Sequence, residues 1–218
     1  MVKGRMEQFR WFLDQVMKSN SNKHMVIFML NWTVVSLCYY LILFRLTHLH
    51  GNMYLNGISS SLAEFCGNII IGAFLVHFGL KQTLIGSFTF MALSSIVYLF
   101  PILTLDIWYA LILFVLKLSL TCAFASVFYG TNSLFREDLV PVIFALCNLL
   151  ARLMTMAAPL ISMQYEQDTT TMAVFLGLSL LGMMCSGFIT EKKRSSSSSS
   201  GGDSHQKKRK KDKRKKKR

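Results

Sequence analysis

Three charged residues lie inside long apolar stretches of the sequence: Glu64, Lys117 and Arg152. A charged side chain at the depth of a lipid bilayer is costly, and it usually faces a protein interior or a water-filled path. A carboxylate and two cations in such a setting can pair with one another, or they can bind the opposite charges of a small organic ion. The chemistry that these residues indicate is therefore ion binding.

Two interpretations of the three charges stay open from the residues alone. In the first, Glu64 pairs with Lys117 or Arg152 as a buried structural tie. In the second, the charges line a pathway for a substrate or an ion. Both can hold together, because a transporter can use an internal ion pair with which its substrate competes. Tyr39, in the preceding apolar stretch, could point its hydroxyl into the same interior.

The charges sit on apolar runs that are long enough to cross a membrane. The chain has 218 residues, of which 52% are hydrophobic and 16% charged, and a transmembrane helix needs about 20 apolar residues. Six runs meet this length: Met25–Phe44, Ile58–His77, Thr83–Leu103, Ile107–Tyr129, Val140–Met163 and Thr171–Ile189. Short connections join them, so we expect an all-α membrane protein with an antiparallel bundle of six transmembrane helices over residues 25–190.

The distribution of charge among the six runs predicts which of them face a polar interior. The second, fourth and fifth runs carry Glu64, Lys117 and Arg152, whereas the third and sixth carry no charge. The second, fourth and fifth are therefore expected to line an interior, and the third and sixth can face lipid on every side.

Lysine and arginine gather at the two ends of the chain. Of the 24, fourteen follow Thr190 and five precede His24. Because cytoplasmic segments of membrane proteins are enriched in these residues, we expect both termini to be cytoplasmic. Residues 1–24 have a helical apolar face and are predicted to form an amphipathic cytoplasmic connector.

Residues 191–218 form a Ser/Gly linker followed by a polybasic tail, which we expect to be disordered. Lys207–Arg218 holds eleven cations and one acid. Attraction to anionic lipids is one interpretation, and an import-like address is a second. Lys215 and Lys216 also match a dilysine retrieval signal. We expect no nucleic-acid binding, because the tail has no aromatic residues.

Nothing in the sequence indicates catalysis. The five histidines and five cysteines form no cluster at metal-ligand spacing, and no Ser-His-acid set or phosphate-binding glycine loop is present. We therefore expect no enzyme activity, no metal and no cofactor.

The region from about residue 25 to 165 resembles the C-terminal half of the organic cation/anion/carnitine transporter family, within the major facilitator superfamily. The resemblance runs in one register with almost no gaps. It rests on these segments: Trp32, Tyr39, Asn52-Met53-Tyr54-Leu55, Ala63-Glu64-Phe65-Cys66, Leu116-Lys117-Leu118, Ala123-Phe124, Phe128, Leu150-Ala151-Arg152 and Ala158-Pro159.

This resemblance implies half of a major facilitator fold that transports small organic ions by alternating access. It implies that Tyr39, Glu64, Lys117 and Arg152 bind substrate, with the first, second, fourth and fifth spans around the site. Lys117 and Arg152 would set a preference for an anion or a zwitterion, and Glu64 would supply a cationic subsite or a counter-ion. A second six-helix half, or a homodimer, would have to complete the site.

Two cytoplasmic loops differ from the family pattern, at Val76–Lys81 and Ser133–Val140. In the family these loops carry the charged latches of the transport cycle. The alternative function is therefore a degenerate half-carrier that does not transport, or a membrane scaffold that displays the basic tail.

Overall fold

The protein is described from a computed structural model, which covers residues 22–46, 48–100, 106–135, 140–164 and 168–189. These residues form five α-helices and no strands: α2 (Asn22–Arg45), α3 (Met53–Leu99), α4 (Asp106–Leu134), α5 (Val140–Gln164) and α6 (Asp168–Gly187). All five contain a window that is long and apolar enough to cross a membrane. The amphipathic connector before residue 22 and the tail after residue 189 lie outside the described residues.

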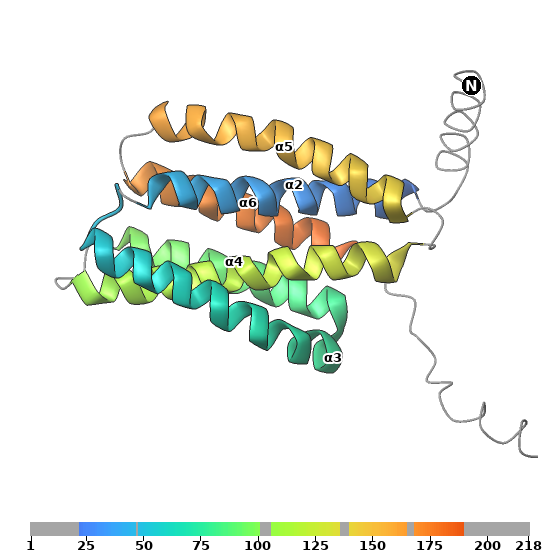
Figure 1. Cartoon of the computed structure of the whole chain (residues 1–218), viewed down its shortest axis with the longest axis horizontal. Helices are drawn as coiled ribbons and strands as arrows, with labels where there is room; N and C mark the ends of the chain where they lie inside the picture. The colour runs from blue at the N-terminus through green and yellow to red at the C-terminus, as the bar shows by residue number, and fades with distance from the viewer. Residues whose placement is uncertain (1–21, 47, 101–105, 136–139, 165–167, 190–218) are drawn as a thin grey trace, which may run out of the picture.

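The helix α3 is too long for a single crossing. Its 47 residues would span about 70 Å if straight, against a hydrocarbon core of about 30 Å. The chain leaves helical geometry at Gly79, where φ is 78° and ψ is 170°, a conformation that favours glycine. Figure 1 shows that the ribbon turns back there.

Two hydrogen bonds establish this reversal. The Thr83 hydroxyl lies 3.4 Å from the carbonyl of Phe74, although nine residues of straight helix would separate them by about 13 Å. The amide of His50, just before α3, donates to the Tyr98 hydroxyl near its other end at 3.1 Å. We call residues 53–78 the first arm of α3 and residues 80–99 its second arm.

The prediction of six separate helices was therefore not confirmed, because five are present in the described residues. The second and third predicted runs lie together in α3 as two helical stretches that meet at Gly79, the residue inside α3 whose φ and ψ are not helical. Boundaries also moved: α2 begins at Asn22, inside the predicted connector, and α3 begins at Met53, five residues before the predicted Ile58.

The bundle has two layers along its short axis. In Figure 1, α5, α2, α4 and the first arm of α3 lie nearer the viewer, while α6 and the second arm lie behind them. We call the surface formed by the four nearer helices the front face. Towards the Gly79 end of the bundle, α5 and the first arm form its two edges.

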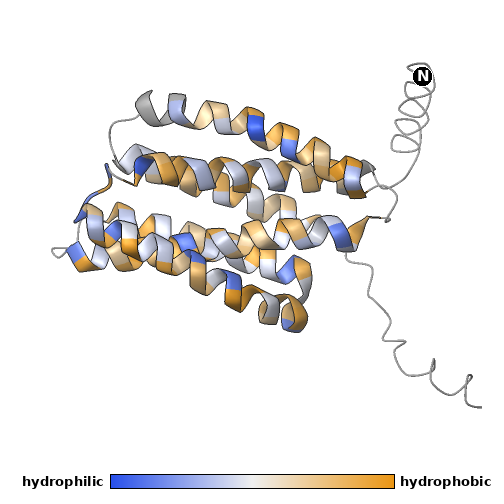
Figure 2. Cartoon of the chain, viewed as in Figure 1, coloured by the Kyte–Doolittle hydropathy of each residue, from blue (hydrophilic) through white to orange (hydrophobic). Residues whose placement is uncertain are grey.

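Two glycines let neighbouring helices approach closely. A Cβ at Gly182 of α6 would collide with the ring of Phe88 in the second arm, and a Cβ at Gly130 of α4 would lie 2.6 Å from the ring of Phe28 in α2. Many large apolar side chains, in contrast, are exposed, on helices that are hydrophobic along most of their length (Figure 2). Phe65 and Val76 of the first arm are 65% and 83% exposed, as expected where helices contact acyl chains.

Candidate functional site

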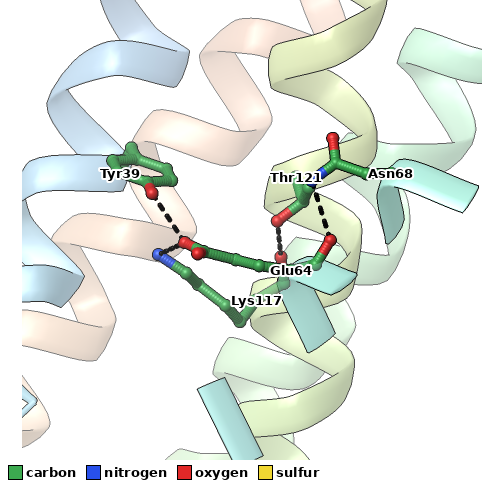
Figure 3. A network of polar contacts seen from close by, with 5 residues as sticks. All are labelled: Tyr39, Glu64, Asn68, Lys117 and Thr121. Carbon is green, nitrogen blue, oxygen red and sulfur yellow. Dashed lines mark hydrogen bonds and ion pairs between the residues drawn. The ribbon is translucent and has the colours of Figure 1, made fainter. Parts of the chain in front are cut away.

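An ion pair and a tyrosine from three helices meet inside the bundle (Figure 3). The Lys117 ammonium on α4 lies 2.8 Å from Oε1 of Glu64 on the first arm. The hydroxyl of Tyr39 on α2 donates to the same oxygen at 2.6 Å. The ammonium also lies 3.7 Å from the centre of the Tyr39 ring, where the negative face of the aromatic system attracts a cation.

Small residues on the first arm bring these groups together. A Cβ at Gly67 would lie 3.0 Å from the Cβ of Thr121 on α4, and Ala63 is fully buried. The Ser59 hydroxyl further ties the arm to α4 by donating to the carbonyl of Ala110 at 2.5 Å. This close contact of the two helices sets Glu64 directly against Lys117.

The two charged groups differ in exposure. The Lys117 side chain is 1% exposed, whereas that of Glu64 is 36% exposed. Oε1 of Glu64 is occupied by its two donors, and Oε2 has no partner among the described residues. A molecule that approaches the pair therefore meets the carboxylate first, with the ammonium behind it.

Arg152, the fourth predicted site residue, lies apart from this pair. Its side chain is exposed on α5, and no described hydrogen bond or ion pair involves it. Phe144, Asn148 and Arg152 are spaced four residues apart and share one side of the helix. Phe144 packs against Phe128 of α4 with ring centres 5.5 Å apart, so this side of α5 is turned towards α4 and the front face.

A row of aromatic rings leads from the ion pair towards the Gly79 end of the bundle. Tyr39 contacts Phe124 at 5.4 Å between ring centres, and Phe124 contacts Phe128 at 5.0 Å. Phe128 then packs on the buried Trp32 at 4.6 Å. The sequence did not reveal this row, because its members come from separate helices.

Two asparagines near the charges were also missed. Asn68 follows Glu64 by one helical turn and is exposed, and its amide donates to the Glu64 carbonyl. Asn148 precedes Arg152 by one turn and donates to the carbonyl of Phe144 at 3.3 Å. Their spacing of four residues from a charge within an apolar run is the signal that could have found them.

The arrangement of the described residues suits ion binding. Among them, no three His, Cys, Asp or Glu side chains lie close enough to hold a metal ion. The pairing of Glu64 with a cation was one of the two open interpretations, and that cation is Lys117. Substrate binding by Tyr39, Glu64, Lys117 and Arg152 stays a prediction.

Comparisons with known proteins agree with a membrane transporter in general terms. No protein-family model matches the chain. The chain is 28% identical over 131 residues to a Caenorhabditis elegans protein named "Putative transporter B0252.3", an alignment that covers 60% of this chain and 26% of that relative. The chain thus spans about a quarter of this relative's length. With five helices able to cross a bilayer, the chain is an integral, multi-pass membrane protein.

Proposed function

We propose that this chain is one half of a transporter that moves small organic ions across a membrane by alternating access. The observation that carries the proposal is the Tyr39–Glu64–Lys117 cluster. It lies within a bundle of membrane-crossing helices, and transporter sites commonly lie near the bilayer midplane between two such units. The likeness to the Caenorhabditis elegans protein supports transport as the general class.

In this proposal α3 crosses the membrane twice, once with each arm, so the chain makes six crossings with both ends in the cytoplasm. The length of α3 and the reversal at Gly79 support two crossings. Six crossings agree with the family resemblance, as half of a major facilitator fold. The chain then acts by binding and moving its substrate, without enzyme chemistry.

The charges favour a zwitterion as substrate, with an anion as the alternative. Glu64 offers a half-buried carboxylate with one oxygen that no described residue contacts, and Arg152 offers an exposed guanidinium on another of the helices proposed to surround the site. These two groups are complementary to the cationic and anionic ends of a zwitterion. A simple anion would rely on Arg152, because Glu64 stands in front of Lys117.

Uptake by proteoliposomes tests the proposal. The full chain is reconstituted and offered a labelled betaine, an organic anion and an organic cation of similar size. We expect saturable betaine uptake that falls at least tenfold in Arg152→Ala and Glu64→Gln, about the effect of losing one charged contact. Leu180→Ala on α6, which is exposed on the rear layer, is the matched control.

Three results would decide against parts of this function. Equal uptake by wild type and Arg152→Ala would remove Arg152 from the substrate site. Faster uptake of the anion than of the betaine would show that the substrate is an anion and not a zwitterion. A wild-type chain that takes up none of the three would favour the degenerate half-carrier or scaffold.

A further inference from the structure

An exposed asparagine lies inside the apolar first arm of α3. Asn68 is fifteen residues from Met53 and ten from Phe78, so it lies about 22 Å and 15 Å from the two ends of the arm. The next side chain, Ile69, is apolar and 64% exposed. A carboxamide that faces hydrocarbon without its hydrogen bonds is unfavourable, so Asn68 is expected to face a polar partner.

Most of the hydrogen-bonding capacity of Asn68 is unused within the described part of the chain. A carboxamide carries two amide protons and an oxygen with two lone pairs. One amide proton is donated to the Glu64 carbonyl at 2.9 Å, and the oxygen and the second amide proton have no partner among the described residues. Gly72, one turn further along, is exposed, and a Cβ there would meet nothing within 4 Å. The following turn therefore leaves the Asn68 amide accessible.

Asn68 is a neighbour of the carboxylate that belongs to the ion pair. Residues four apart lie on one side of a helix, with Cβ atoms about 6 Å apart, and Figure 3 shows Asn68 and Glu64 on the same stretch of the first arm. Lys117 and Tyr39 both contact Oε1 of Glu64, which leaves Oε2 without a described partner. The two neighbouring side chains therefore offer a negative charge and a carboxamide, one helical turn apart.

The adjacent helix α4 does not supply the missing partner. Gly67 is the residue of this turn that contacts α4, where its Cβ would lie 3.0 Å from the Cβ of Thr121. The Thr121 hydroxyl, drawn in Figure 3, donates to the Lys117 carbonyl at 2.9 Å. The hydrogen bonds of this contact are thus made within α4, and a partner for Asn68 has to come from outside the described residues.

We propose that Asn68 is a specificity-determining residue, which hydrogen-bonds an oxygen-bearing substituent of the substrate while Glu64 binds its cationic group. This inference rests on the proposed function, because it concerns the substrate of the same site. The carboxamide can donate to a carbonyl or hydroxyl oxygen and can accept from a hydroxyl. An analogue without that oxygen leaves the amide unmatched and binds less well. Asn68 lies outside the segments that carry the family resemblance, so this contact belongs to this chain.

Competition binding to the full-length chain in lipid nanodiscs tests the contact. The probes are the betaines of homoserine and norvaline, which differ only by a hydroxyl in place of a methyl, three carbons from the cationic nitrogen. We expect wild type to bind the hydroxyl compound about fivefold more tightly, the contribution of one neutral hydrogen bond. Asn68→Leu should lose this preference, and Asn68→Gln, which retains a carboxamide, should recover part of it.

Asn132→Leu is the matched control for the binding experiment. Asn132 is also exposed, and its amide also donates to the carbonyl four residues earlier, that of Phe128, at 3.2 Å. It lies two residues before α4 ends at Leu134, away from the ion pair. This variant should keep the fivefold preference.

Cysteine labelling in lipid vesicles tests the surroundings of Asn68 without any substrate. A thiol reacts as its thiolate, which forms in water and not in hydrocarbon. Asn68→Cys should therefore react about tenfold faster with a charged methanethiosulfonate than Ile69→Cys, at the next position of the arm. Labelling is counted above that of wild type, and the homoserine betaine should slow the reaction of Asn68→Cys.

An equal preference in wild type and Asn68→Leu, or a preference lost in Asn132→Leu, would overturn the inference. Labelling of Asn68→Cys no faster than Ile69→Cys would also overturn it, because Asn68 would then face lipid or another helix, as would a wild type that binds neither betaine. Uptake in the same vesicles separates the two proposals. A preference that depends on Asn68 without uptake keeps the contact and rejects transport, and uptake without that preference does the reverse.

Discussion

Replacing Glu64 by Gln should destabilise the protein more than replacing Lys117 by Met, although both changes break the same ion pair. Removing one partner of a buried pair costs about 3–5 kcal/mol, because it strands the other charge. Glu64→Gln strands the Lys117 ammonium, which is 1% exposed. Gln keeps a neutral acceptor and the Tyr39 ring stays in place, so we expect the lower end, about 3 kcal/mol.

Lys117→Met strands the carboxylate instead. Glu64 is 36% exposed and keeps the hydrogen bond from Tyr39, and a hydrogen bond to a charged group stabilises by about 1.5–3 kcal/mol. We therefore expect Lys117→Met to lower the free energy of unfolding by about 1–2 kcal/mol. The double variant removes both charges and should cost about 1 kcal/mol, because an apolar replacement of an ion pair is often close to neutral.

The free energy of unfolding can be followed by titrating sodium dodecyl sulfate into mixed micelles. Trp32 is buried between Phe128 and Phe144, so its fluorescence, measured with Trp11→Phe and Trp108→Phe in the background, reports loss of packing near the site. A double-mutant cycle then gives the coupling between the two charges. A cost for Lys117→Met equal to or above that of Glu64→Gln, or additive effects in the double variant, would refute the argument from exposure.

Two further predictions concern contacts between helices. Gly182→Ala should lower the free energy of unfolding by about 1–3 kcal/mol, because the added Cβ overpacks against the fully buried Phe88. Gly177→Ala on the same helix should not destabilise the protein, since a Cβ there meets nothing within 4 Å. Equal melting temperatures for the two variants would contradict this prediction. Ser186→Ala should lower the free energy of unfolding by about 0.6 kcal/mol, because it removes the hydrogen bond from the Ser186 hydroxyl to Asn31. Ser94→Ala should lower it less, because the Ser94 hydroxyl donates only within its own helix.

The sequence predicted the elements better than their junctions. Apolar length located every helix, because crossing a bilayer demands a long run without charge. The count of six separate helices was not confirmed at one place: two helical stretches meet at Gly79 within α3, and the Thr83 hydroxyl donates to the Gly79 carbonyl at this turn. The break at Gly79 falls in the short connection predicted between the second and third runs, Ile58–His77 and Thr83–Leu103.

Among the site residues, the sequence identified the charges but could not assign their pairing. Glu64 could have met Lys117 or Arg152, and spacing within one run says nothing about contacts between runs. Glu64 meets Lys117 because Gly67 and Ala63 are small, which lets the first arm lie against α4. The aromatic row from Tyr39 to Trp32 could not be predicted, because its members come from different helices.

The order of burial within the ion pair constrains how the site can work. Lys117 lies behind Glu64, so a substrate anion reaches the ammonium only by displacing the carboxylate and breaking the contact with Oε1. A cationic group, in contrast, can bind the free oxygen without disturbing the pair. Lys117 then acts mainly by holding the Glu64 carboxylate in place, and in the proposed function the group that binds an anion must come from another helix. Arg152 on α5 is an exposed cation, so in the proposed function the preference for an anionic group depends on Arg152.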